Sequence, residues 1–387
     1  MSTSLRPGRS AIVRGLVAGA LAATLIAVSA LVSAPASAGS QQTGLATAVS
    51  QIGGEWGGLT GVYRISYRTI DARGEDVAAS GIVRLPSGPR PPGGWRIVSW
   101  AHGTSGLGPD CGLTGSADLI RGTAPAIAAL NRAGYAVVAT DYIGLGPGST
   151  TPHPYLQTWS EATAVVDIVR AARSVFAGLS RTWAVGGSSQ GGHAALGAGH
   201  IAAQYAPDLD FRGTAALAPA SNFESIIPLM RPGIPALPKG MSGPFAAILA
   251  GMSANQDDVD VEAYLSPLGK RVVDEVSRSC GPQWEGILAG ARPDSLLSKP
   301  LGDNAFRSAL RDYMSVPTAD YGRPILVVHG FRDTTVPIPL TYRLLAGFRS
   351  AGTGYEFETI NANHTDLRAK GGMDDAVTFF ERVMPAQ

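Results

Sequence analysis

The stretch at 181–193, RTWAVGGSSQGGH, constrains the fold most, because it predicts a strand, a sharp turn and a helix in direct succession. Such a turn needs glycine two places before and two places after its apex, since a Cβ there would collide with the turned backbone. Ser189 meets both conditions, with Gly187 and Gly191, whereas Ser188 lacks the second glycine. We therefore predict Ser189 at the apex. It would lie at a helix N-terminus, where free N–H groups favour developing negative charge.

Residues 1–38 predict a secretory signal peptide. Arginines precede a nearly apolar run at 15–32, and Ala-Ser-Ala at 36–38 fits a signal-peptidase site. An uncleaved membrane anchor is the alternative. No later stretch is long and apolar enough to span a bilayer. The expectation is a secreted protein, cleaved after Ala38.

The charges nearly balance, with 31 Lys and Arg against 30 Asp and Glu. This composition offers no electrostatic basis for binding nucleic acid or anionic lipid. The chain is long enough for one large core, or for a core that carries an inserted cap.

Cys111 and Cys280 are the two cysteines of a chain expected in an oxidising compartment, so they favour one disulfide. It would close a loop of roughly 170 residues and stabilise the fold by about 5 kcal/mol. Two free thiols are the alternative. Two cysteines cannot form a structural zinc site, and H-E-x-x-H is absent, so no metal is expected.

The rest of the chain alternates strands and helices. Residues 41–58 are small and polar and predict a loosely ordered lead-in, followed by an antiparallel strand pair at 62–68 and 77–85. The later predicted strands are 96–101, 135–140, 183–185, 213–218, 324–329 and 355–360. The predicted helices are 124–133, 161–176, the segment after Ser189, 340–350 and 373–382. This order predicts an α/β fold with a mostly parallel, doubly wound sheet.

Two segments carry more specific expectations. The helix at 161–176 places apolar residues on one face and charge on the other, with Ser160 as its N-cap. The segment 221–320 is rich in Pro, Met and Gly and continues no strand, which predicts an inserted cap or, alternatively, a separate subdomain. The α/β core would then comprise residues 39–220 and 321–387.

Ser189 needs a base to take its proton and an acid residue to orient that base. In a parallel sheet such groups lie beyond the carboxyl ends of strands. Asp333 follows the strand at 324–329, and His364 follows the strand at 355–360. The order Ser, Asp, His is typical of an α/β-hydrolase catalytic triad.

Other candidates fit less well. His193 and His200 lie on the helix after Ser189, where they would face away from the turn or pack internally. His329 ends a strand and predicts a structural histidine. His153 has no acid residue near it in sequence, and Asp366 would have to fold back onto His364.

An oxyanion hole needs two donors. One is the backbone N–H of Gln190, the residue after the nucleophile. The second could come from the loop at 102–104, with Thr104, or from the loop at 141–144, with Asp141. A dinucleotide loop at 103–108 is excluded, because position 111 lacks the third glycine and Pro109 lacks an N–H. No cofactor is therefore expected.

Five segments together resemble the secretory lipase family. They are the turn around Ser189, AHGTSG at 101–106, DYIGLG at 141–146, PHPY at 152–155 and HGFRD at 329–333. The resemblance implies an α/β-hydrolase fold with an inserted cap, a triad of Ser189, Asp333 and His364, and hydrolysis of carboxylic esters, including acylglycerols. It also implies Asp141, rather than Thr104, as the second oxyanion donor.

The sequence thus predicts a serine hydrolase, either a lipase or a carboxylesterase. A serine peptidase on the same fold and a catalytically silent binding protein are the alternatives. The expected partner is a small-molecule or lipid ester, with transient contact to a lipid interface through the cap. Nucleic acid is not an expected partner, and the chain is expected to be a monomer.

Overall fold

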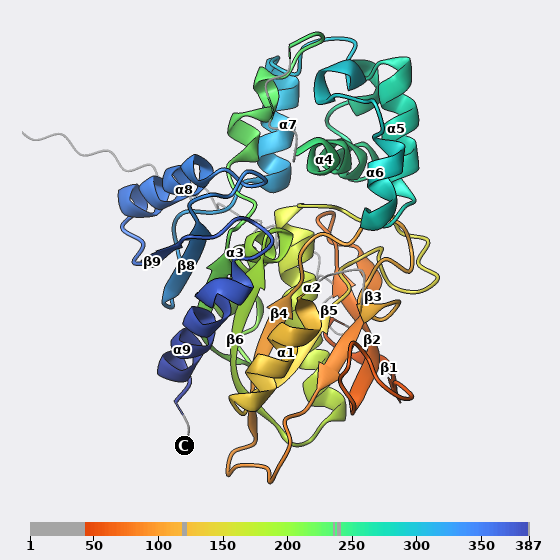
Figure 1. Cartoon of the computed structure of the whole chain (residues 1–387). Coiled ribbons are helices and arrows are strands. Elements are labelled where there is room, and N and C mark those ends of the chain that lie inside the picture. Colours follow the sequence, from red (N-terminus) through yellow and green to blue (C-terminus); the bar gives the residue numbers. More distant parts are fainter. Residues whose placement is uncertain (1–42, 118–121, 235–236, 238–240, 386–387) are drawn as a thin grey trace, which may run out of the picture. The chain divides into compact units, whose positions relative to one another are not determined.

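The computed structural model describes residues 43–117, 122–234, 237 and 241–385 (Figure 1). The expected signal peptide and its cleavage site lie outside these residues. No helix within the described ranges is long and apolar enough to cross a membrane.

Nine strands of the described chain form one sheet, in the order β1-β2-β3-β5-β4-β6-β7-β8-β9. The strands are β1 (Ala46–Gln51), β2 (Val62–Ile70), β3 (Asp76–Arg84), β4 (Trp95–Ala101), β5 (Ala136–Thr140), β6 (Leu179–Ser188), β7 (Asp210–Leu217), β8 (Ile325–Gly330) and β9 (Glu356–Ile360). The first three strands and the β3–β5 pair are antiparallel. All pairs from β5 to β9 are parallel, which confirms the predicted fold class.

Helices cover both faces of the sheet (Figure 1). The helices of the core are α1 (Thr123–Arg132), α2 (Thr158–Val175), α3 (Gln190–Tyr205), α8 (Ile338–Ala351) and α9 (Met373–Val383). One apolar cluster joins α1 and α9 to one face, and others join α2, α3 and α8 to the opposite face. Neighbouring residues such as Ile97 and Val98 enter different clusters, as expected for a strand buried on both sides.

The described part of the lead-in predicted at 41–58, residues 43–58, is more ordered than its composition suggests. Its residues 46–51 form β1, which pairs antiparallel with β2. Trp56 is buried, and its indole N–H donates to the carbonyl of Leu113 at 2.8 Å. The expectation of a loose segment is therefore wrong. The segment is ordered because β1 pairs with β2, and the composition of the segment alone did not indicate this pairing.

The charged face predicted for the 161–176 helix is also wrong. α2 begins at Thr158, and the side chain of Gln157, not Ser160, caps it by accepting from the backbone N–H of Ser160 at 2.7 Å. Glu161 and Asp167 are 1% and 0% exposed. Both carboxylates therefore lie in the protein interior and need polar partners there.

Asp167 should make stability depend on pH. Burial raises the pKa of Asp167 to about 6, although hydrogen bonds from Tyr205 and Thr69 oppose the shift. Because an unfolded aspartate titrates near about 4, the folded state binds this proton more tightly. The free energy of unfolding should then fall as pH rises from about 4 to about 6, by up to about 3 kcal/mol. Urea unfolding of wild type and Asp167→Asn at about pH 4.5 and about pH 7.5 measures this effect. The free energy of unfolding of the variant, minus that of wild type, should be larger at the higher pH. An unchanged difference would contradict the prediction.

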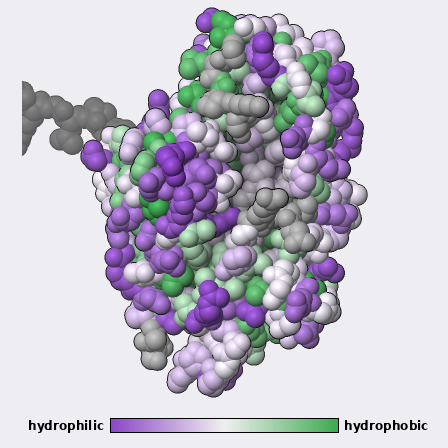
Figure 2. Space-filling view, viewed as in Figure 1, coloured by the Kyte–Doolittle hydropathy of each residue, from purple (hydrophilic) through white to green (hydrophobic). Residues whose placement is uncertain are grey.

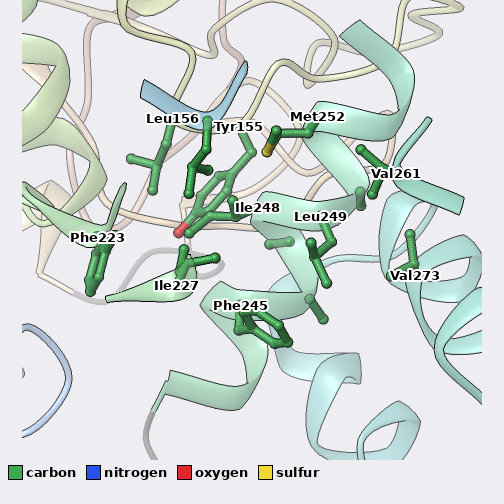
Figure 3. Close-up of a cluster of buried hydrophobic side chains, with 14 of the residues drawn as sticks. Tyr155, Leu156, Phe223, Ile227, Phe245, Ile248, Leu249, Met252, Val261 and Val273 are labelled. Carbon is green, nitrogen blue, oxygen red and sulfur yellow. The ribbon is translucent and has the colours of Figure 1, made fainter. Parts of the chain in front are cut away.

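The segment between β7 and β8 is helical. Its helices are α4 (Ser242–Asn255), α5 (Pro267–Ser277), α6 (Trp284–Ile287) and α7 (Asn304–Met314). Its described residues add no strand to the sheet. Apolar side chains of α4 and α5 pack with Tyr155 and Leu156 in one buried cluster (Figure 3). Hydrophilic side chains lie along the outer side of α5 (Figure 2), so this helix is amphipathic.

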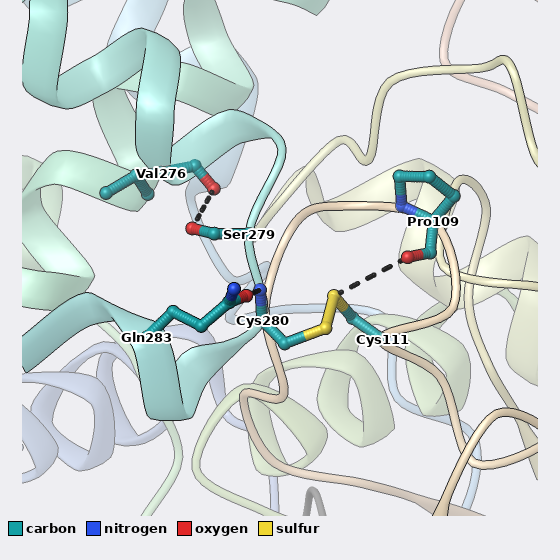
Figure 4. The surroundings of a disulfide bond; sticks show 6 residues. All are labelled: Pro109, Cys111, Val276, Ser279, Cys280 and Gln283. Atoms are coloured by element: carbon teal, nitrogen blue, oxygen red, sulfur yellow. Dashed lines mark hydrogen bonds between the residues drawn. A yellow bond between two sulfur atoms is a disulfide. The ribbon is translucent and has the colours of Figure 1, made fainter. Parts of the chain in front are cut away.

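A disulfide joins Cys111, in the loop after β4, to Cys280, after α5 (Figure 4). The pairing is as predicted, with a sequence separation of 169. Backbone hydrogen bonds flank it: the N–H of Leu107 donates to Ser279 at 3.0 Å, and that of Gly281 donates to Ser105 at 2.6 Å. The disulfide thus ties the helical segment to a loop at the carboxyl edge of the sheet.

Replacing both cysteines by serine should lower the free energy of unfolding by about 2–5 kcal/mol, because the long loop regains its freedom in the unfolded chain. Guanidinium unfolding of the double variant and of oxidised wild type measures the difference. Reduced wild type should match the variant. A difference below about 0.5 kcal/mol would contradict the prediction.

Candidate active site

Ser189 lies between the end of β6 and the first residue of α3. Its φ of 62° and ψ of −121° are strained for a residue with a side chain. A Cβ added at Gly191 would lie 1.9 Å from the carbonyl oxygen of Ala101, and one at Gly187 would lie 2.3 Å from that of Gly191. The close packing explains why the turn requires both glycines, as the sequence indicated.

His364 and Asp333 meet Ser189 in one hydrogen-bonded chain. Nε2 of His364 lies 2.9 Å from Oγ of Ser189, and Nδ1 lies 2.6 Å from Oδ2 of Asp333. An ionised carboxylate only accepts, so Nδ1 carries the proton and Nε2 is free to accept one from Ser189. The side chain of Asp333 is 0% exposed and that of His364 is 15% exposed, so the imidazole of His364 remains reachable from solvent.

The loops after β8 and β9 hold Asp333 and His364 together. The N–H of Phe331 donates to Ile360 at 3.1 Å, and the N–H of Arg332 donates to Ala362 at 3.1 Å. A Cβ on Gly330 would lie 2.5 Å from the carbonyl oxygen of Ala362, so glycine is needed for this approach.

Asp333 is held as a carboxylate. Its Oδ1 accepts from the backbone N–H groups of Thr335 and Val336, both at 2.8 Å. Burial alone would raise the pKa of Asp333. Its contacts with His329 and His364 and the bond from Val336 outweigh burial and lower the pKa well below its usual value. A charged carboxylate at this point would stabilise an imidazolium on His364.

Asp141 cannot serve as an oxyanion donor. Its backbone N–H donates to the carbonyl of Ser80 at 2.7 Å. Its buried carboxylate accepts from the Ser80 hydroxyl at 2.5 Å and from the Thr114 N–H at 2.9 Å. The structure contradicts the choice of Asp141, because its one backbone donor already has an acceptor in the sheet.

Thr104 and Gln190 are better placed. A Cβ on Gly103, the residue before Thr104, would lie 3.8 Å from Cβ of Ser189. Among hydrogen bonds between described residues, the backbone N–H of Thr104 has no acceptor. The N–H of Gln190 opens α3 and has no acceptor within the helix.

The competing residues all have other partners. Nε2 of His329 bonds to the carbonyl of Val336 at 3.0 Å, and its Nδ1 to the Thr341 hydroxyl at 2.9 Å. His200 bonds to the carbonyl of Ala319 at 3.1 Å. Asp366 pairs with Lys370 at 2.8 Å.

The sequence did not predict a buried polar network that links α3 to α2 and to the loop before α2. It joins Gln190, His153, Glu161 and His193, all at most 2% exposed. An acidic residue in the first turn of a helix, directly before a run of alanine and valine, as at Glu161, is the signal that could have indicated it. No group of three or more residues able to hold a metal occurs in the described ranges.

Comparisons with known proteins bear on the family and the fold. The sequence model of the secretory lipase family matches residues 119–382. A comparison with curated protein sequences gave no match. The ligand-bound esterase LipA of Xanthomonas oryzae, described as rice cell wall degrading, is a similar solved structure, with 22% identity, TM-score 0.68, and coverage of 88% of this chain and 98% of LipA.

Candida antarctica lipase A in its closed state is similar at 19% identity and a TM-score of 0.67, covering 86% of this chain and 83% of the lipase. At such identities these likenesses show the shared fold. The family match spans most of the chain. We conclude that the chain belongs to the secretory lipase family and is a carboxylic ester hydrolase.

Proposed function

We propose that the chain cleaves carboxylic esters through an acyl-enzyme on Ser189. The observation that carries this proposal is the unbroken contact from Asp333 through His364 to Ser189, at 2.6 and 2.9 Å. These distances lie within the range needed for proton transfer between a nucleophile and its base.

In the proposed reaction, Oγ of Ser189 bonds to the ester carbonyl carbon as Nε2 of His364 takes the hydroxyl proton. The backbone N–H groups of Gln190 and Thr104 hold the resulting oxyanion. The carbon–oxygen bond to the alcohol then breaks, and the alcohol leaves with the proton from His364. Water attacks the acyl-enzyme with the same base and releases the carboxylic acid and free Ser189.

The proposed substrates are small-molecule or lipid esters, including acylglycerols, and the chain is proposed to act as a monomer. We propose that the cap makes transient contact with a lipid surface through exposed apolar residues such as Leu229 and Ile234, in the segment before α4, which are 58% and 42% exposed. The family and the Cys111–Cys280 disulfide support a secreted protein. We also propose that residues 1–38 are removed during export. The N-terminal sequence of the exported protein tests this, and it should begin at residue 39.

A series of p-nitrophenyl esters from acetate to palmitate, with a p-nitroanilide of the same acyl group, tests the proposal. Ester turnover should exceed amide turnover by a large factor. Activity that rises toward palmitate identifies a lipase, and a maximum at acetate or butyrate identifies a small-ester esterase. Equal turnover of amide and ester, or no turnover of any ester, would contradict the proposal.

A further inference from the structure

The side chain of Gln190 is buried beside the nucleophile and uses both of its N–H groups. Nε2 of Gln190 lies 3.1 Å from Nε2 of His153 and 2.8 Å from Oε1 of Glu161. Among the described residues its Oε1 has no partner. The amide is therefore held through its nitrogen alone, by groups from α2 and from the loop before it.

The protonation state of His153 fits this arrangement. Its Nδ1 lies 2.7 Å from the carbonyl of Ile143, which can only accept, so Nδ1 carries the proton. Nε2 is then an acceptor for Gln190. Burial lowers the pKa of His153 to about 3, so the ring stays neutral at ordinary pH.

Of the two groups that accept hydrogen bonds from the Gln190 side chain, Glu161 has more hydrogen-bond partners than His153. Its Oε1 also accepts from the N–H of Leu156 at 3.0 Å, and its Oε2 lies 2.7 Å from Nδ1 of His193. Nε2 of His193 contacts the carbonyl of Met314 at 3.1 Å. Both ring nitrogens of His193 thus face acceptors, and a doubly protonated ring offsets the buried charge of Glu161.

We propose that Glu161 and His153 are positioning residues for ester hydrolysis, acting through the side chain of Gln190 to fix the direction of its backbone N–H. The inference rests on the proposed function, in which that N–H holds the oxyanion. The first N–H groups of a helix have no intrahelical acceptor, so the N–H of Gln190 is not held directly. The carbonyl of the same peptide, on Ser189, accepts from the N–H groups of His193 and Ala220, both at 3.1 Å, and the anchored Gln190 side chain adds a restraint on the other side of the peptide. Anchoring the side chain restrains the peptide next to the strained Ser189 backbone.

Gln190→Met tests the anchor, because methionine keeps the length of the side chain but donates no hydrogen bond. For p-nitrophenyl butyrate, kcat should fall about 10- to 100-fold with KM within about twofold, as for a displaced oxyanion donor. Thr158→Val is the matched control. It removes the hydroxyl 3.2 Å from Nε2 of His193 and leaves the partners of Gln190 in place, so kcat should stay within about twofold.

Two substitutions of Glu161 test the same hydrogen bond by changing its acceptor. Glu161→Gln keeps a carbonyl oxygen that accepts from Gln190 and should lose less than about fivefold in kcat. Glu161→Leu removes that acceptor and should lose as much as Gln190→Met. Melting temperatures measured alongside separate a general loss of folding from a specific loss of kcat.

The outcomes separate the inference from the proposal beneath it. Suppose that Ser189→Ala is inactive. If Gln190→Met then keeps kcat within about twofold of wild type, or if Glu161→Gln and Glu161→Leu have equal kcat, the positioning role is wrong but the acyl-enzyme proposal stands. If Ser189→Ala retains full turnover, the proposed function itself fails.

Discussion

Ser189→Ala is expected to lower kcat for p-nitrophenyl butyrate by at least about 10⁴, with KM and the melting temperature nearly unchanged. Alanine keeps the backbone of the turn but removes the oxygen that bonds to the acyl carbon. Only the catalysis supplied by the oxyanion hole and by substrate binding would remain. Steady-state kinetics with enzyme purified free of wild type measures the loss.

The neighbouring Ser188 supplies a matched control. It ends β6, is 4% exposed and directly precedes Ser189, so Ser188→Ala makes the same change in side-chain volume at nearly the same place. Its kcat should stay within about threefold of wild type. A large loss for Ser188→Ala combined with full activity of Ser189→Ala would assign the nucleophile to the other serine.

Asp333→Asn is expected to lower kcat by about 10⁴. Asparagine can donate to Nδ1 of His364, which favours the ring tautomer with the proton on Nε2. That tautomer cannot accept the proton of Ser189, and the charge that stabilises the imidazolium is lost. The kinetics should be measured beside unfolding curves, because the asparagine also faces the backbone N–H groups of Thr335 and Val336.

Asp366→Asn is the control for Asp333, since Asp366 is the other acid residue close to His364 in sequence. Asp366 pairs with Lys370 and accepts from the N–H of Asn363, so its loss should change kcat by less than about threefold. If Asp366→Asn loses activity and Asp333→Asn does not, the orienting carboxylate has been misassigned.

The sequence predicts the strands of the sheet, the turn at Ser189 and the positions of Asp333 and His364 after strands, because these features follow local rules. Runs of small apolar residues predict strands covered on both faces. Glycines on both sides of Ser189 predict the turn. Asp333 and His364 could be placed because the carboxyl ends of parallel strands share one edge of the sheet.

Features that depend on distant partners could not be predicted. β1 is ordered by its pairing with β2, and its own composition does not favour a strand. Glu161 is buried because His193 and Gln190 neutralise and bond it, yet both come from another helix. A pattern of charge along one helix cannot reveal partners of that kind.

The error at Asp141 has a similar cause. The residue follows β5, so its position in sequence suits an oxyanion donor. However, β5 pairs antiparallel with β3, and this brings the carbonyl of Ser80 to the Asp141 N–H. Sequence order shows where a strand ends, but the strand beside it decides which backbone groups remain free.

Trapping the acyl-enzyme tests the central claim most directly. Enzyme mixed with p-nitrophenyl butyrate and quenched in acid within the first turnovers should carry one butyryl group. Peptide mass spectrometry should locate it on Ser189, and the group should be absent from Ser189→Ala. A butyryl group on any other residue, or turnover with no covalent intermediate under conditions where acylation is fast, would contradict the account.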